Sequence, residues 1–190
     1  MKPIIPAPLG CPVLRKAMCL LLLLFCCALC QTASAQNPTV SVSGVVSLEA
    51  VAAGKMGQPI VFTLTPTGTT TGAVTTQTVT LNAQTGAFTL TDVPPGTYIL
   101  GAKGSKWLRK DTPISTLNGS VAGLNISLLG GDLNDDNKIN IFDYLVLSNA
   151  YNSVPGDANW NPNADIDCNG RVNIFDYLIL SQNYQKQGDP

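Results

Sequence analysis

The chain has 190 residues, 11 basic and 12 acidic side chains, and a formal net charge of −1 at pH 7. It contains no histidine, which excludes the pairing of serine or cysteine with histidine that many hydrolases use. Eight of the twelve acidic residues fall between positions 132 and 176, and no basic surface is evident, so no nucleic-acid partner is expected.

Residues 1–35 are predicted to be a cleaved signal peptide. Lys2 and Arg15 supply its positive start, residues 18–29 form an apolar run, and residues 33–35 read Ala-Ser-Ala, the small-residue pattern of a cleavage site. A membrane-spanning helix needs about 20 apolar residues, more than this run holds. We therefore expect a secreted protein, extracellular or associated with the cell surface and free of the membrane after cleavage, with a lipid-anchored form as the alternative.

Residues 36–129 are predicted to form a β-sandwich of about seven strands. Apolar and polar residues alternate in short runs, and Gly, Pro and Asn lie between them, as is typical of such folds. The runs are 40–42, 61–64, 79–81, 87–90, 98–100 and 121–128.

One hairpin of this segment resembles a known family. Residues 88–100, FTLTDVPPGTYIL, are similar to carboxypeptidase regulatory-like, or prealbumin-like, domains. The resemblance implies a spacer module in a secreted protein, in a fold that includes some carbohydrate binders. Trp107, beside Lys106 and Arg109, is the candidate for stacking on a sugar, with partly buried packing as the alternative.

No enzyme is expected. Outside residues 132–176 the acidic side chains are Glu49, Asp92, Asp111 and Asp189. A glycosidase needs two carboxylates that flank a cleft, and a domain of about 90 residues leaves little room for one.

Residues 132–151 return as residues 165–184, thirty-three positions later, with ten of twenty residues identical. Each copy carries oxygen-bearing side chains at positions 1, 3, 5, 9 and 12 of a loop, and this spacing wraps a calcium ion together with the backbone carbonyl of position 7. The pattern predicts two calcium ions, with a metal-free acidic surface as the alternative. The candidate ligands are Asp132, Asn134, Asp136, Lys138, Asn140 and Asp143 in loop 1, and Asp165, Asp167, Asn169, Arg171, Asn173 and Asp176 in loop 2.

Three further loop positions carry expectations. Position 6 needs a left-handed backbone, which Gly170 and Asn137 accept. At position 8, Ile139 and Val172 are expected to pair the two loops through a short backbone bridge. Cys168, at position 4, is the sole cysteine after residue 35, so no internal disulfide is expected; we predict an exposed thiol, with an intermolecular link as the alternative.

A helix is predicted after each loop, over residues 141–151 and 174–184. The apolar residues of each helix spread over more than half of its circumference, whereas a packed helix needs a stripe of about 100°. The surplus must face the sandwich, the loop that carries Trp160 or an outside partner.

The segment 131–184 resembles a dockerin domain, a duplicated calcium-loop-plus-helix module. Loop 1 follows a strand without an entering helix, and position 12 is Asp rather than the Glu of EF-hands; both features match that family. The resemblance implies a monomer that binds a cohesin-like partner through its helices, in an assembly linked to polysaccharide degradation. The family's best-studied members carry Ser-Thr at positions 10 and 11, where this chain has Ile-Phe. The candidate partner-binding residues are Ile141, Phe142, Ser148, Asn149, Ile174, Phe175, Ser181 and Gln182.

The fold class predicted is therefore mixed: an all-β sandwich over residues 36–129 and a small all-α dockerin over residues 130–187. Two alternatives remain for the function. One is a structural module in which calcium is a staple and the helices pack on the sandwich, and the other is a carbohydrate-binding protein that reads sugar through the sandwich.

Overall fold

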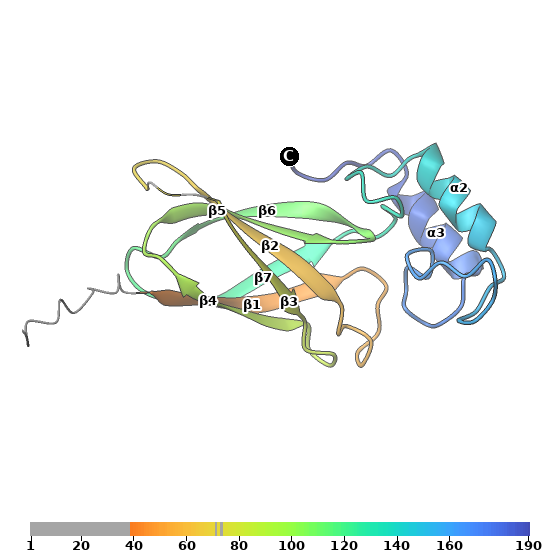
Figure 1. Cartoon of the computed structure of the whole chain (residues 1–190), viewed down its shortest axis with the longest axis horizontal. Helices are drawn as coiled ribbons and strands as arrows, with labels where there is room; N and C mark the ends of the chain where they lie inside the picture. The colour runs from red at the N-terminus through yellow and green to blue at the C-terminus, as the bar shows by residue number, and fades with distance from the viewer. Residues whose placement is uncertain (1–38, 71, 73) are drawn as a thin grey trace, which may run out of the picture. The chain divides into compact units, whose positions relative to one another are not determined.

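The computed structural model describes residues 39–70, 72 and 74–190, so the predicted signal peptide lies outside the described residues. Within these residues, seven strands precede two helices (Figure 1). This confirms the prediction of a β domain of about seven strands followed by two helices. The elements are β1 (Val40–Leu48), β2 (Pro59–Pro66), β3 (Thr75–Thr80), β4 (Ala87–Val93), β5 (Thr97–Gly104), β6 (Trp107–Ser115), β7 (Val121–Leu128), α2 (Ile141–Ala150) and α3 (Ile174–Asn183).

The strands form two sheets, one in the order β4-β1-β7 and the other in the order β3-β2-β5-β6. Strands β1 and β7 run parallel, and every other named pair is antiparallel. The turn before β4 contains Gly86 at φ 69°, where a Cβ atom would lie 2.2 Å from the carbonyl oxygen of Val46. Glycine is therefore needed there both for its conformation and for space.

The sandwich core lies between the two sheets. Along β2 the residues Ile60, Phe62 and Leu64 alternate inward and are fully buried. The ring of Phe62 stacks on that of Phe88 from the other sheet, with centroids 4.4 Å apart and planes inclined by 24°. Offset stacking of this kind adds to the stabilisation that comes from area burial alone.

Strand β6 was not predicted, because none of the alternating runs found in the sequence covers its residues. It begins at Trp107, whose side chain is 1% exposed, and Trp107 pairs with Gly104 of β5 and bridges to Gly130. The sugar-stacking role considered for Trp107 is therefore wrong, because no ring face is accessible. The sequence could not decide between sugar stacking and buried packing for Trp107, because its burial depends on contact with Gly130, 23 positions away.

Both helices begin at a capping box. The side chain of Asn140 accepts a hydrogen bond from the backbone of Phe142, and Asp143 bonds back to the backbone of Asn140; the second helix repeats this arrangement. Each helix ends one residue earlier than predicted, because Tyr151 and Tyr184 take an extended conformation (ψ near 138°). No helix in the described part of the chain is long and apolar enough to span a membrane.

A second hydrophobic core lies around the loops and helices, and it includes one residue of the sandwich. Leu108 of β6, 4% exposed, belongs to the cluster that contains Ile139, Leu147 and Leu180. Its backbone N–H donates to Leu129 at 2.8 Å. Residues 38–190 accordingly form one compact unit. The domain boundaries at 129 and 130 stay a prediction.

A hydrogen-bonded cluster joins the end of β1 to α3. The Glu49 carboxylate accepts from the backbone N–H of Gly130 at 3.0 Å and from the side-chain amide of Asn183. That amide also donates to the Gly130 carbonyl oxygen at 2.9 Å. Asn183 stands where the first repeat has Ala150, so only α3 makes this contact.

Candidate functional site

The two loops have the same internal hydrogen bonds at position 1. Asp132 accepts from the backbone N–H of positions 5 and 6 at 2.9 and 3.0 Å, and Asp165 accepts from the equivalent groups at 3.0 Å each. Each loop is therefore closed around the carboxylate with which it begins. The two aspartates are buried.

Position 12 fixes the other end of each loop. Asp143 accepts from Leu133 and from Asn140 at 2.7 Å each, and Asp176 repeats these bonds at 2.7 and 2.8 Å. The same aspartate thus closes the loop and starts the helix. Asn140 and Asn173, predicted as position 9 ligands, also cap the helices, a role that the ligand spacing did not suggest.

Loop 2 brings three carboxylates together. Oxygens of Asp165, Asp167 and Asp176 all lie within 4.8 Å of one another. Burial raises the pKa of Asp165 and of Asp176 above the ordinary value, since removal from water disfavours the charged form. Oxygen donors crowded at this spacing are the set that a calcium ion accepts, so the residues fit the metal.

Loop 1 uses its carboxylates differently. Lys103 of β5 places its ammonium 2.8 Å from Asp132 Oδ2 and 2.5 Å from Asp135 Oδ1. Asp136 accepts from the backbone of Lys138 at 2.9 Å and from the Asn134 amide at 3.0 Å. Burial still raises the pKa of Asp132, with Lys103 opposing the shift. Loop 1 has the donor types for calcium, but a cation of the protein already sits on its first ligand.

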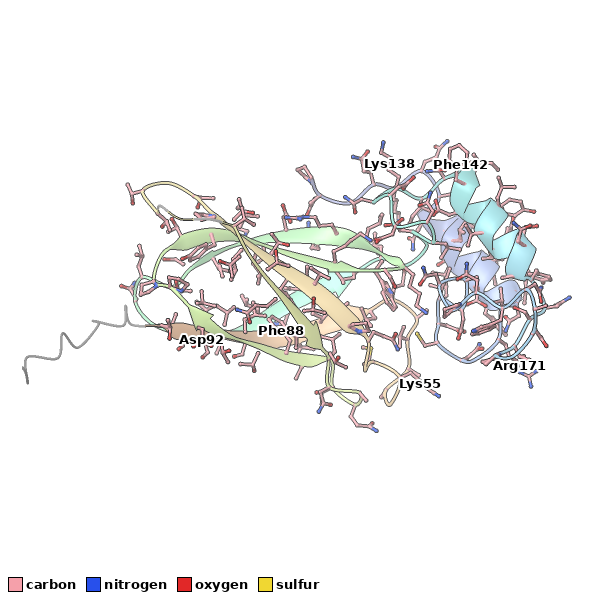
Figure 2. All side chains as sticks on the ribbon, in the orientation of Figure 1. Lys55, Phe88, Asp92, Lys138, Phe142 and Arg171 are labelled. Atoms are coloured by element: carbon pink, nitrogen blue, oxygen red, sulfur yellow. The ribbon has the colours of Figure 1, made fainter. Side chains whose placement is uncertain are left out.

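The remaining predicted ligands lie along the same two loops. In loop 2 the Asn169 amide donates to Asp167 at 2.8 Å, the counterpart of the Asn134 bond to Asp136. The side chains of Lys138 and Arg171 are exposed (Figure 2), and their carbonyl groups stay the predicted ligands at position 7.

The left-handed positions in the loops agree with expectation and add two more. Asn137 has φ 64° and Gly170 has φ 86°. Asp135 and Cys168, at position 4, are also left-handed, at φ 62° and 59°. These two were missed because Asp and Cys do not mark such positions as glycine does.

Asn137 also ties loop 1 to distant parts of the chain. Its side-chain oxygen accepts from the Arg109 N–H, and its amide donates to the Asp189 carbonyl oxygen, each at 2.8 Å. The Asp189 carboxylate in turn accepts from the Asp111 N–H at 2.8 Å and from Lys110 at 2.9 Å, and these bonds lower its pKa. Gly170 offers no side chain for an equivalent contact in loop 2.

The expected bridge between the two position 8 residues is wrong. Ile139 pairs with the segment after α3, donating to Lys186 at 2.9 Å and accepting from Gln185 at 2.8 Å. Val172 pairs in the same way with residues 152–153 after α2, at 2.9 and 3.1 Å. Each loop is therefore clamped by the chain that leaves the other helix, which buries both position 8 side chains in the second core.

Cys168 is not the exposed thiol that we expected. It is half-buried and packs against the sandwich core, and burial raises the pKa of its thiol. Hydrophobic packing of a small side chain accounts for its position.

The surplus apolar surface of the helices is exposed. All eight predicted partner-binding residues are exposed, and Phe142 and Phe175 are each 61% exposed. Phe142 lies at the start of α2 (Figure 2). Further exposed apolar residues lie on the same helices or at the position that caps each of them. They were not predicted as contacts, although the wide apolar circumference of the helices pointed to them: Tyr144, Leu145, Tyr151, Tyr177, Leu178 and Tyr184.

Two open grooves on this face are related by the internal repeat. One, of about 400 Å³, is lined by Ile141, Tyr144, Tyr177, Leu180, Ser181 and Tyr184. The other, of about 340 Å³, is lined by Ile174, Tyr177, Tyr144, Leu147, Ser148 and Tyr151. Each residue of the first has its counterpart 33 positions away in the second. The rings of Tyr144 and Tyr177 separate the grooves and meet edge to face, 6.2 Å between centroids.

Comparison with known proteins finds a family match for the C-terminal segment. Residues 130–183 match the family model of the dockerin type I domain. A search of curated proteins finds no match.

Two similar crystal structures are described as the N-terminal and the C-terminal interface mutants of a type II cohesin–X-dockerin complex from Acetivibrio cellulolyticus. Each matches at a TM-score of 0.61 and 21% identity, over 78% of this chain and 97% of theirs. A DUF3823 family protein from Parabacteroides merdae matches half of this chain and 48% of its own at 15% identity, and its TM-score of 0.37 supports no argument. The segment 130–183 is thus similar in sequence to dockerin type I domains, and the chain shares its fold with a chain from a cohesin–dockerin complex.

Proposed function

We propose that this protein is a secreted, non-catalytic attachment protein. Its loops bind two calcium ions, and the exposed face of α2 and α3 docks on a cohesin-like domain of another protein. The calcium ions supply positive charge that holds the loop carboxylates together, and the helices present the binding residues.

The observation that carries the proposal is the uncharged, apolar face repeated on the two helices. The charged residues within α2 and α3 are Asp143 and Asp176, and both are buried. Aromatic side chains without charge are characteristic of the centre of a protein–protein interface. Monomers rarely leave a patch of this kind unoccupied.

The face favours a folded protein partner with a largely apolar surface. At positions 10 and 11 of both loops this chain has Ile-Phe, where the best-studied dockerins have Ser-Thr. The residues are Ile141, Phe142, Ile174 and Phe175. Ser148 and Ser181 line the grooves and supply polar contacts beside the rings. The partner would therefore contribute aliphatic side chains to the grooves and a few hydrogen-bonding groups at their ends.

The purely structural alternative, with helices packed on the sandwich, explains less. Leu108 enters the second core beside Leu147 and Leu180, so contact with the sandwich accounts for the buried face of the helix pair. It leaves the exposed face without a role.

The proposal also covers the location of the protein, its oligomeric state and the role of its sandwich. We place the protein outside the cell or on its surface as a monomer, in an assembly concerned with polysaccharide degradation. The sandwich, of the carboxypeptidase regulatory-like type, would act as a spacer. No described residue now supports sugar binding by Trp107.

Binding to a panel of cohesin domains of both types, measured by surface plasmon resonance, tests the proposal. The chain expressed from Gln36 should bind at least one of them in calcium and none in chelator. The double variant Phe142→Ala with Phe175→Ala should lose about thirtyfold or more in affinity, as expected for residues at the centre of an interface. Leu117→Ala is the matched control, since Leu117 on the sandwich is also 61% exposed. Equal binding by the double variant and the control would refute the role of this face.

A further inference from the structure

Two lysines near the β5–β6 turn contact the two calcium loops in unlike ways. Lys103 binds a carboxylate oxygen of Asp132, the first ligand of loop 1. Lys106, 5% exposed, instead donates to two backbone carbonyl oxygens near the start of loop 2, those of Pro162 at 3.1 Å and of Asp165. The side-chain carboxylate of Asp165 therefore keeps its oxygens for the loop, whereas that of Asp132 is shared.

Lys103 is fixed in place by more than this one contact. Its ammonium also donates to the carbonyl oxygen of Gly104 at 2.7 Å and to Asp135 at 2.5 Å, and its side chain is 20% exposed. A lysine with three acceptors, partly removed from water, is a more persistent partner than a surface ion pair.

The two loops otherwise have matching internal bonds at positions 1 and 12. They differ in the lysine contact at the first ligand, which reaches the side-chain carboxylate of Asp132 in loop 1 but the backbone carbonyl of Asp165 in loop 2. Among the described residues, the three carboxylates whose oxygens lie within 4.8 Å of one another belong to loop 2. Position 3 of loop 1 is Asn134 rather than an acid, so loop 1 has no equivalent triad. Asp136 accepts from the Lys138 backbone and the Asn134 amide much as Asp167 accepts twice from Asn169. The contact of Lys103 with Asp132 is the one that loop 2 does not repeat among the described residues.

We propose that Lys103 lowers the calcium affinity of loop 1 below that of loop 2, so that the sandwich makes the two sites inequivalent. This inference rests on the proposed calcium binding and not on the partner. A positive charge bonded to a ligand carboxylate weakens the attraction of that carboxylate for a second cation. The same charge stabilises the calcium-free loop, because it neutralises part of a buried carboxylate. Both effects reduce the gain from binding at loop 1.

The orientation of Asp132 does not depend on Lys103. The backbone N–H groups of Asp136 and Asn137 hold its two oxygens in either case. Removal of the ammonium therefore removes charge and leaves the loop geometry in place. Calcium affinity at loop 1 should rise.

The consequence for docking is a response in two stages. Loop 2 precedes α3 and fills at lower calcium, whereas loop 1 precedes α2 and fills at higher calcium. Docking that needs both loops filled would therefore follow the second stage.

Calcium titration by isothermal calorimetry on the chain expressed from Gln36 tests the inference. The unaltered chain should bind in two resolved steps. Lys103→Met should tighten the weaker step by about tenfold and leave the stronger step unchanged within about twofold. Lys103→Arg, which keeps the charge, should leave both steps as they are. Lys55→Met is the control for net charge, because Lys55 is an exposed lysine of the sandwich (Figure 2).

Assignment of the weaker step uses Asn134→Ala, a change at the exposed position 3 of loop 1. It should weaken that step alone. As a second measurement, Lys103→Met should lower the melting temperature in chelator more than in calcium, which stays measurable even if the calcium-free variant is largely unfolded.

Two binding steps of equal affinity, or a weaker step that Lys103→Met leaves unchanged, would overturn the inference while calcium binding stands. Absence of any calcium binding by the unaltered chain would instead overturn the proposed function, and this inference with it.

Discussion

Leu108→Ala tests whether the sandwich and the helical segment share a core. Leu108 belongs to β6, yet its side chain lies in the cluster with Leu133, Ile139 and Leu147 and is 4% exposed. The substitution removes three carbons from a nearly closed site. At about 0.8 kcal/mol per buried methylene, the lost transfer free energy is about 2.4 kcal/mol. The cavity that remains adds to this, so the free energy of unfolding should fall by about 3 kcal/mol.

The assay is urea unfolding at fixed calcium, followed by tryptophan fluorescence and circular dichroism. Both tryptophans report on the shared region, since Trp107 bridges to Gly130 and Trp160 packs on the second core. Leu117→Ala should change the free energy of unfolding by less than about 0.5 kcal/mol, because its side chain is exposed. A loss below about 1 kcal/mol for Leu108→Ala, or one equal to the control, would refute the reasoning.

Two further predictions concern the loops. Asn137→Gly should lower the free energy of unfolding by about 1–2 kcal/mol, because it leaves the Arg109 N–H and the Asp189 carbonyl without their partner, even though the left-handed backbone suits glycine. Gly170→Asn should cost less than about 1 kcal/mol in the same urea assay, because no atom lies within 4 Å of the added Cβ. A larger loss at Gly170 would contradict this. The second prediction is a dependence on pH. Burial raises the pKa of three loop carboxyls, so the calcium-free folded chain binds more protons than the unfolded chain, and these groups make it less stable as pH rises from about 4 toward neutrality. The three carboxyls belong to Asp132, Asp165 and Asp176. Calcium binds their ionised forms, so the rise in melting temperature on adding calcium should grow as pH increases over the same interval. A rise in melting temperature that is constant from pH 4 to 7 would argue against these ligands.

The features that sequence predicted well depend on local patterns. The two loops that carry the candidate ligands could be located because alternate oxygen-bearing positions and a left-handed position 6 are set within twelve residues. The helices could be placed because an apolar run follows each loop, and the strands because alternation marks a half-buried surface. The exposed apolar face was expected because the apolar residues of each predicted helix cover more of its circumference than packing needs.

The features that sequence missed depend on residues far apart in the chain. Strand β6 reads WLRKDTPIS and has no period of two along its length, since Leu108 enters a different core from the rest of the strand. The pairing of Ile139 with the chain after α3, and the contact of Lys103 with Asp132, each join residues about 30 to 50 positions apart. Periodicity and spacing carry no information on such contacts. Asn137 was accepted as a substitute for glycine, when its side chain also makes two long-range hydrogen bonds.

The parallel pairing of β1 with β7 has a mechanical consequence. Strand β7 ends at Leu128 and loop 1 begins at Asp132, so three residues join the sheet to the first loop. Tension between the start of β1 and a partner held by α2 and α3 would pull the two strands in opposite directions along their length, from Val42↔Val121 to Leu48↔Leu128. The hydrogen bonds between them would then be loaded together, in shear, rather than opened one after another. Such a pair resists extension far better than a hairpin peeled from its end, which is the property that the proposed attachment role would need.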